Sequence, residues 1–393
     1  MNQGRSILIR AALVFVSSGT DCMALDMARL ISSACAFRIA LSNRLATEVI
    51  RVLWKAFMHG REHAAHERDN NRLVRPFAWG LPFIMDHVNG DDPRAVLSNY
   101  SRQAMAHSED FYALAEISDF ELNDDQLTWT SAIHTPDAKN NLARARYFPV
   151  NEKRARKPRT AVVVLPQWNA QPESHVEACR IFNFIGMSAL RLTLPYHQER
   201  RPVDLERADH LVSTNVGRTI QSMRQGVLDT RAAVRWLKNQ GYERIGILGT
   251  SVGSCIAFLA FAHEPDINAG TFNHVSGYVA DVAWRGLSTL HLREGFADHL
   301  TLEELREYWA PISPVPFIAR LPAMGQRPMR FIAARYDLTF PIDLTQQTIA
   351  EAKRHKLPLD VVWLSCGHYT MADMPWKAID AWKIATFMRK HLK

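Results

Sequence analysis

The chain has 393 residues, of which 47% are apolar and 22% charged, with 18 glycines and 19 prolines. That much apolar surface offsets the entropy of ordering and excludes a disordered chain, while the glycine and proline contents exclude collagen-like and low-complexity architectures. A net charge of +7 is mild for this length, so we expect no nucleic-acid partner.

The five cysteines are widely spaced and form no Cys-x-x-Cys pair. This argues against a disulfide framework and a structural zinc site, and we expect no metal. No run of 18 apolar residues is present, so a spanning helix and stable membrane insertion are not expected. The oligomeric state is left open.

The N-terminus carries two short apolar runs, 7–9 and 11–16, which Arg10 separates. A signal peptide needs a longer uninterrupted apolar core, so we expect a cytoplasmic protein, with secretion through a weak signal as the alternative. A start at Met23 or Met27 is also open.

Apolar residues recur at helical spacing over 23–60. We expect one or two helices that cover a core; a membrane-surface helix with an arginine face is the alternative. Residues 71–92 are rich in proline and aromatics and predict an irregular strap, and Asp92-Pro93 predicts an N-cap starting a helix towards residue 115. Residues 1–125 are thus predicted to form an N-terminal helical extension packed on the core.

From residue 126 onward strands are predicted, and from 161 they alternate with helices. The pattern predicts an α/β protein with a doubly wound, mostly parallel sheet over 126–393. The expected strands are 127–133, 142–150, 161–165, 188–194, 245–248, 275–280, 329–334 and 359–365, and the expected helices are 173–185, 216–239, 251–263, 344–355 and 376–391. Residues 282–322 are predicted to be a helical insertion, either a small lid or an extra packed hairpin.

The strongest chemical motif is Gly249-Thr250-Ser251-Val252-Gly253, of the form G-x-S-x-G. It follows an apolar predicted strand and opens an apolar predicted helix, the strand–turn–helix context that a nucleophile elbow requires. Such a turn holds the Ser251 hydroxyl clear of the sheet, and the helix N-terminus favours negative charge above it. A glycine-rich turn with an incidental serine is the alternative.

A serine nucleophile needs a base, and the base needs an acid that orients it. His368 is the histidine that comes just after a predicted strand, on a glycine-containing loop. Asp337, which follows the strand predicted over 329–334, is the preferred acid, and Asp281, after residues 275–280, is its rival. The predicted catalytic residues are Ser251, Asp337 and His368.

With these motifs, residues 126–393 resemble the α/β-hydrolase superfamily, and in particular a branch of abhydrolase-domain proteins. The resemblance rests on GTSVG, RYDLTFP and CGHYT, on their Ser…Asp…His order, and on the segments LPQWNAQ, LPYHQERRP and WAPISP. It implies an esterase- or lipase-like serine hydrolase that works without a cofactor. The chain departs from the family at the HG oxyanion motif, where residues 166–169 read Pro-Gln-Trp-Asn.

An oxyanion hole needs N–H donors rather than particular side chains. Pro166 has no N–H, so the predicted donors are the backbone N–H groups of Val252 and of Gln167 or Trp168.

Four further residues are candidates for substrate binding. Asn169, Tyr196 and His197 follow strands at the predicted carboxyl edge, and Trp284 belongs to the insertion. A structural loop and plain packing of the insertion are the alternatives.

The sequence therefore predicts a serine hydrolase that acts on a small carboxylic ester through an acyl-enzyme intermediate. A thioesterase, peptidase or acyltransferase on the same three residues, or a catalytically dead binding protein with this fold, are the alternatives.

Overall fold

A computed structural model describes residues 43–69, 71–85, 90, 92–155 and 157–393. The predictions for the N-terminal apolar runs and for residues 23–42 lie outside these residues. The chain divides into two compact units, Met1–Arg68 and Asp69–Lys393, and helix α3 (Asn43–Arg68) belongs to the first. The predicted boundary at residue 125 stays a prediction; residues 69–125 fall within the larger unit.

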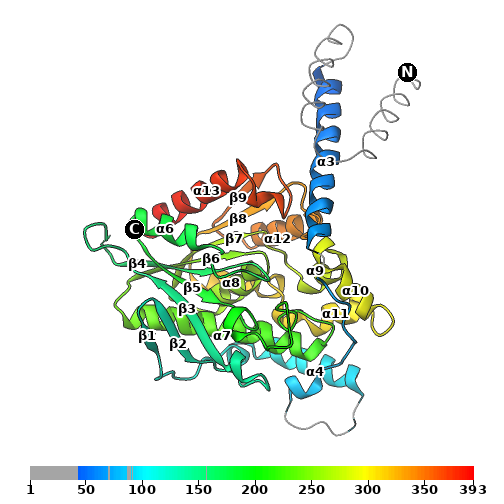
Figure 1. Cartoon of the computed structure of the whole chain (residues 1–393), viewed down its shortest axis with the longest axis horizontal. Coiled ribbons are helices and arrows are strands. Elements are labelled where there is room, and N and C mark those ends of the chain that lie inside the picture. Colours follow the sequence, from blue (N-terminus) through cyan, green and yellow to red (C-terminus); the bar gives the residue numbers. More distant parts are fainter. Residues whose placement is uncertain (1–42, 70, 86–89, 91, 156) are drawn as a thin grey trace. The chain divides into compact units, whose positions relative to one another are not determined.

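A nine-stranded sheet organises the larger unit, in the order β1-β2-β3-β5-β4-β6-β7-β8-β9 (Figure 1). Strands β1, β2 and β3 are antiparallel to their neighbours, and β4 to β9 are parallel to one another. The doubly wound, mostly parallel α/β sheet is therefore confirmed. The strands are β1 Glu121–Asn123, β2 Gln126–Thr130, β3 Leu142–Phe148, β4 Thr160–Leu165, β5 Ser188–Thr193, β6 Arg244–Thr250, β7 Ile267–Asn273, β8 Met329–Ala334 and β9 Leu359–Leu364.

Helices cover both faces of this sheet. On one face lie α6 (Val176–Phe184) and α13 (Trp376–His391), and on the other α7 (Val216–Asn239), α8 (Val252–His263) and α12 (Ile342–Arg354) (Figure 1). Strands β4 and β5 are buried along their whole length, as expected of parallel strands covered on both sides. The carboxyl ends of β4 to β9 therefore share one edge, where the loops are free to carry function.

The segments outside the sheet agree in part with the sequence. Asp92 caps α4 (Pro93–Ala106) by accepting a hydrogen bond from Arg94 N, and the strap before it contains only the short helix η1 (Leu81–Phe83) among its described residues. The remaining described elements are α5 Ser108–Phe111, η2 Ala138–Asn141, η3 Gln198–Arg200, α9 Val279–Arg285, η4 Leu287–Thr289, α10 Leu290–Phe296, α11 Leu302–Tyr308, η5 Ala310–Ile312, η6 Val315–Met324 and η7 Thr370–Ala372.

One predicted strand is wrong. Residues 275–280 form no strand; the strand in this part of the sheet is β7, and residue 279 begins α9. The β7 sequence INAGTFN contains glycine and two asparagines, which are depleted in strands, so its propensity concealed it. Pairing with β6 and β8 decides the structure here.

None of the helices within the described residues combines the length and the hydropathy needed to cross a membrane.

Candidate active site

Ser251 lies at the turn between β6 and α8, and its backbone is strained. Its φ of 57° and ψ of −126° fall where residues other than glycine are rare. The strain is held from both sides, because Ser251 N donates to Asn273 O over 2.9 Å and Ser254 N donates to Ser251 O over 2.8 Å. The side chain therefore projects from the carboxyl edge of the sheet at the start of α8.

The two glycines of the motif are required by close packing. A Cβ on Gly249 would lie 2.3 Å from Gly253 O, and one on Gly253 would lie 2.3 Å from Pro166 O. Any larger residue at either position would push helix and strand apart. The second contact also places the first turn of α8 against the loop that follows β4.

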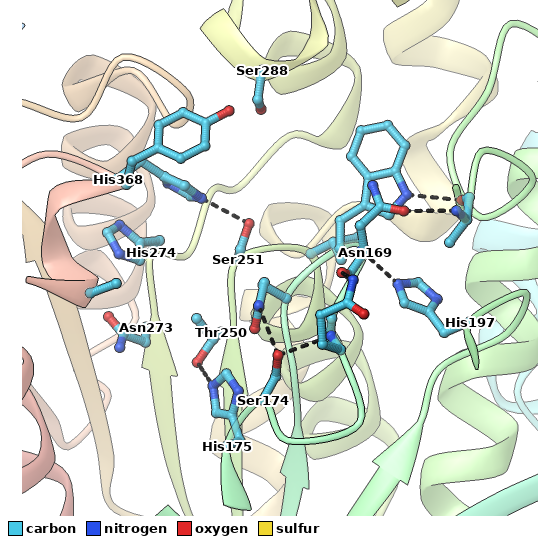
Figure 2. Close-up of a pocket in the computed structure, with 18 of the residues that line it drawn as sticks. Asn169, Ser174, His175, His197, Thr250, Ser251, Asn273, His274, Ser288 and His368 are labelled. Carbon is cyan, nitrogen blue, oxygen red and sulfur yellow. Dashed lines mark hydrogen bonds between the residues drawn. The ribbon is translucent and has the colours of Figure 1, made fainter. Parts of the chain in front are cut away.

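Ser251, His368 and Asp337, the three residues that the sequence predicts as catalytic, come together, and Figure 2 shows the Ser251 and His368 side chains pointing toward each other. The Ser251 Oγ lies 3.0 Å from His368 Nε2, and His368 Nδ1 lies 3.0 Å from Asp337 Oδ2. Each side chain comes from a loop at the carboxyl edge, after β6, β9 and β8 respectively. A proton on Ser251 thus has a continuous path to the imidazole.

The Asp337 carboxylate is buried and fully used as an acceptor. Its Oδ1 accepts from Thr339 N at 2.8 Å and from Phe340 N at 2.6 Å. Burial by itself would raise the pKa of Asp337, but the positive character and hydrogen bonds of His368 and His274 outweigh it and hold that pKa well below its usual range. The carboxylate is therefore ionised, as an orienting acid must be.

His274 is a residue of this site that sequence reasoning missed. Its Nδ1 lies 2.8 Å from Asp337 Oδ2, the oxygen that also binds His368, and the two imidazole centroids are 4.3 Å apart. It comes directly after β7, so a correct prediction of that strand would have placed His274 at a strand end and made it a candidate site residue. Its φ of 55° shows that the turn, like that at Ser251, is held in a rare conformation.

The ring nitrogens of His274 and His368 and the carboxylate of Asp337 also form the cluster with metal-ligand spacing among the described residues. The two Nδ1 atoms, however, lie 2.8 and 3.0 Å from the carboxylate oxygen. Two ligand atoms around a tetrahedral zinc are separated by about 3.3 Å. The cluster therefore fits hydrogen bonds better than a shared ion.

Asp281, the rival acid, does not reach this site. It lies on α9 rather than at a strand end, and its side chain is 2% exposed. Arg306 donates to both of its oxygens, at 2.6 and 2.9 Å. The ion pair ties α9 to α11 and leaves Asp337 as the acid beside His368.

The loop after β4 carries Gln167 and Trp168 beside the first turn of α8. Neither backbone N–H donates to another group within the described part of the chain. The N–H of Val252, the first helical residue, has no acceptor of its own in the helix, as at any helix N-terminus. All three predicted oxyanion donors therefore line the same cavity as Ser251.

Asn169 and His197 hold this loop in place. Asn169 has a φ of 57°, its N donates to His197 Nε2 over 2.9 Å, and its Oδ1 accepts from Ala208 N over 2.7 Å. The Trp168 indole donates to Ala208 O over 2.9 Å. Burial lowers the pKa of His197 to about 4, so the ring is neutral and Nε2 is a pure acceptor.

A cavity of about 1340 Å³ surrounds Ser251 and His368. Asn169 and His197 line it, as predicted, but Tyr196 and Trp284 do not. Tyr196 is fully buried, with its N bonded to Asn140 Oδ1, and Trp284 stacks on Phe296 with centroids 6.3 Å apart. The insertion reaches the cavity through other residues instead: Val282, Ala283, Ser288 and Thr289.

Comparisons with known proteins show which fold the chain has. No protein-family profile and no curated protein matches the sequence. Among solved structures, an acetyl xylan esterase from Thermoanaerobacterium is similar with a TM-score of 0.54 and 12% identity, over 77% of this chain and 100% of that one. An acetyl xylan esterase from Paenibacillus gives a TM-score of 0.50 and 13% identity, over 77% and 96%.

The acylaminoacyl peptidase of Pyrococcus horikoshii is also similar, with a TM-score of 0.53 and 14% identity, over 70% of this chain. The matched region spans 42% of the peptidase's length. At such identities the likeness concerns the fold. The parallel sheet, the serine at the strand–helix turn and these structural relatives together show that the chain has the α/β-hydrolase fold.

Proposed function

We propose that the protein is a serine hydrolase that cleaves carboxylic esters, with Ser251 as nucleophile, His368 as base and Asp337 as orienting acid. The observation that carries the proposal is the hydrogen-bonded chain from Ser251 Oγ through both ring nitrogens of His368 to an ionised Asp337, open to a cavity. A serine that served only to cap α8 would need no such base.

In the proposed reaction Ser251 Oγ attacks the ester carbonyl carbon while its proton passes to His368 Nε2. The C–O bond to the alcohol then breaks, and His368 returns the proton to the departing alkoxide. Water attacks the acyl-enzyme by the same route, with His368 taking its proton, and the acid leaves as Ser251 is regenerated.

The negative charge on the carbonyl oxygen would be met by N–H groups of Val252 and of Gln167 or Trp168. Support comes from the packing of Gly253 against Pro166, which brings both backbone segments to one place. Losing one such donor typically costs about a hundredfold or more in rate, so the hydrogen bonds of Asn169 and His197 matter for activity.

A fluorophosphonate probe and one substitution test the proposal. The probe should label Ser251, identified by mass spectrometry of the digested protein, and Ser251→Ala should lose labelling and at least a thousandfold in hydrolysis of p-nitrophenyl butyrate, roughly what removal of a nucleophile costs elsewhere. Ser101→Ala, which removes a buried hydroxyl on α4, is the matched control and should keep both. Labelling of another residue, or an active Ser251→Ala, would overturn the assignment.

The class of bond is tested with substrates that share one acyl group. We expect the butyryl ester to be cleaved at a higher kcat/KM than the corresponding thioester and anilide. A preference for either of the others would replace the esterase proposal with a thioesterase or a peptidase while leaving the nucleophile in place.

A further inference from the structure

The cavity extends to both sides of Ser251. Figure 2 shows Ser288 on one side and Thr250, His175 and Asn273 on the opposite side. On the Ser288 side the lining includes Val279, Val282 and Phe340. On the other side the cavity runs between α6 and α13, and its walls differ in chemistry from the first side.

The floor between α6 and α13 consists of the ends of β6 and β7. Successive residues of a strand face opposite sides, and a Cβ on Gly246 would touch Leu392 and Met388, at the end of α13. Leu248 and Thr250 therefore face the same way, and in the parallel register Thr250 lies beside Asn273. All three line the cavity.

This side holds buried acceptors that lack donors. Asn273 is 3% exposed, its Nδ2 donates to Asp380 Oδ2 over 2.8 Å, and both Asn273 Oδ1 and Asp380 Oδ1 are buried without a hydrogen-bond partner. His175 Nε2 and Thr250 Oγ1 lie 2.8 Å apart and satisfy each other. Unpaired buried polar atoms are costly, so the two oxygens call for a hydrogen-bonding partner from outside the chain.

The charged side chains around this pocket largely balance, because Glu177 lines the cavity together with Arg180 and Lys377, so they do not select an ammonium group. Arg180 and Lys377 line the same side of the cavity, and Lys377 Nζ lies 2.5 Å from Glu177 Oε2, which joins α13 to α6. Burial raises the pKa of Asp380 to about 7, so near neutral pH its carboxyl group can carry a proton and then donates a hydrogen bond as well as accepting one. A hydroxyl group, which both donates and accepts, fits these surroundings.

We infer that the pocket formed by His175, Thr250, Asn273 and Asp380 is a substrate subsite that binds a hydroxyl group carried by the ester, on its alcohol or its acyl half. The inference rests on the proposed function and narrows its substrates to hydroxylated esters. Because Ser251 N is bonded to Asn273 O, the subsite is joined directly to the backbone of the nucleophile.

Two matched substrate pairs test it. We would compare 1-butyrylglycerol with propyl butyrate, and methyl 3-hydroxybutyrate with methyl butyrate, by titrating the acid released. In at least one pair the wild-type protein should prefer the hydroxylated ester by about tenfold or more in kcat/KM, because a site built for a hydroxyl rejects an analogue that lacks it. Asp380→Leu should reduce that preference to less than about threefold, and Asp380→Asn, which keeps an acceptor, should retain most of it.

Equal kcat/KM values within both pairs for the wild type would overturn the inference, since the acceptors would then be served by water. A preference that survives Asp380→Leu would overturn it too. To separate this from failure of the proposed function, binding of 1-butyrylglycerol and propyl butyrate to Ser251→Ala is measured by calorimetry. If no ester is hydrolysed, tighter binding of 1-butyrylglycerol that Asp380→Leu removes still supports the subsite, and equal binding rejects it.

Discussion

Ser251 lies between two hydrogen-bond networks of different character. On one side, two imidazoles and two backbone N–H groups converge on the ionised carboxylate of Asp337. On the other, the neutral ring of His197 and the amide of Asn169 fix a loop through hydrogen bonds to backbone groups.

The comparison shows how burial gives histidine two different uses. A ring that shares a buried carboxylate can take up a proton, because the negative charge favours its cation. A ring buried without such a partner stays neutral and serves as a fixed acceptor. In the proposed mechanism the first network therefore moves protons, and the second positions oxyanion donors.

The largest effect is expected from Asp337→Asn. The amide keeps the size of the side chain but removes the charge that stabilises the protonated imidazole, so kcat/KM for p-nitrophenyl butyrate should fall by roughly a thousandfold or more. Asp343→Asn on α12, which loses only a surface pairing with Arg285, is the control and should remain active. A loss of less than tenfold in kcat/KM for Asp337→Asn would contradict the assignment of Asp337 as the orienting acid.

The next largest loss of activity is expected in the network of the neutral His197. His197→Phe fills the same space but removes the acceptor for Asn169 N, which should loosen the oxyanion loop and lower kcat by about 10- to 100-fold. Its pH profile should keep the wild-type midpoint, since His197 takes no proton in the mechanism. His263→Phe, at an equally buried histidine near the C-terminal end of α8, should change neither quantity. A shifted midpoint in His197→Phe would show that the two networks are not distinct.

A smaller effect is expected at His274. Its removal leaves Asp337 Oδ2 to His368 alone, which favours the protonated imidazole, so the acid limb of kcat/KM should move to higher pH. His274→Ala should show this shift with a loss of about tenfold or less at the plateau. His274→Asn, whose amide replaces the Nδ1 donor and tolerates the left-handed backbone, should stay close to the wild type. An unmoved acid limb in His274→Ala would leave His274 with a purely structural role.

The smallest effect concerns the stability of the folded state. Because the pKa of Asp380 is raised to about 7 in the folded protein, its protonated form stabilises the fold at low pH, and this contribution is lost as the pH rises through 7. Asp380→Asn has no such titrating group. From pH 4 to pH 8 the free energy of unfolding of the wild type should therefore fall relative to that of Asp380→Asn by about 1 kcal/mol or more. Denaturant titrations across this range would measure the difference, and a constant difference would contradict the raised pKa.

Much of the larger unit could be predicted from local patterns. Helices α7 and α13 and strand β8 lie where apolar periodicity predicts them, and the glycines around Ser251 indicate a tight strand–helix turn. Because the carboxyl ends of parallel strands meet at one edge, the positions of Ser251, Asp337 and His368 after strands were enough to predict that they lie together.

The errors come from strand pairing and from side-chain packing, which act between segments remote in the sequence. Strand β7 has weak strand propensity, so it was misplaced, and its displacement concealed His274 and made Asp281 look like an acid at a strand end. Tyr196 and Trp284 also follow or lie near predicted site segments, but packing turns Tyr196 into the core and Trp284 onto Phe296.

The sequence by itself determined the alternation of strands and helices, the elbow and the order of its three candidate catalytic residues, because these depend on neighbours along the chain. Only the tertiary structure decided which histidines share a carboxylate and which are neutral supports. That choice depends on what surrounds each ring after folding: a carboxylate shared by His368 and His274, and a backbone N–H for His197. Burial and distance between remote segments set these environments, and no local pattern encodes either.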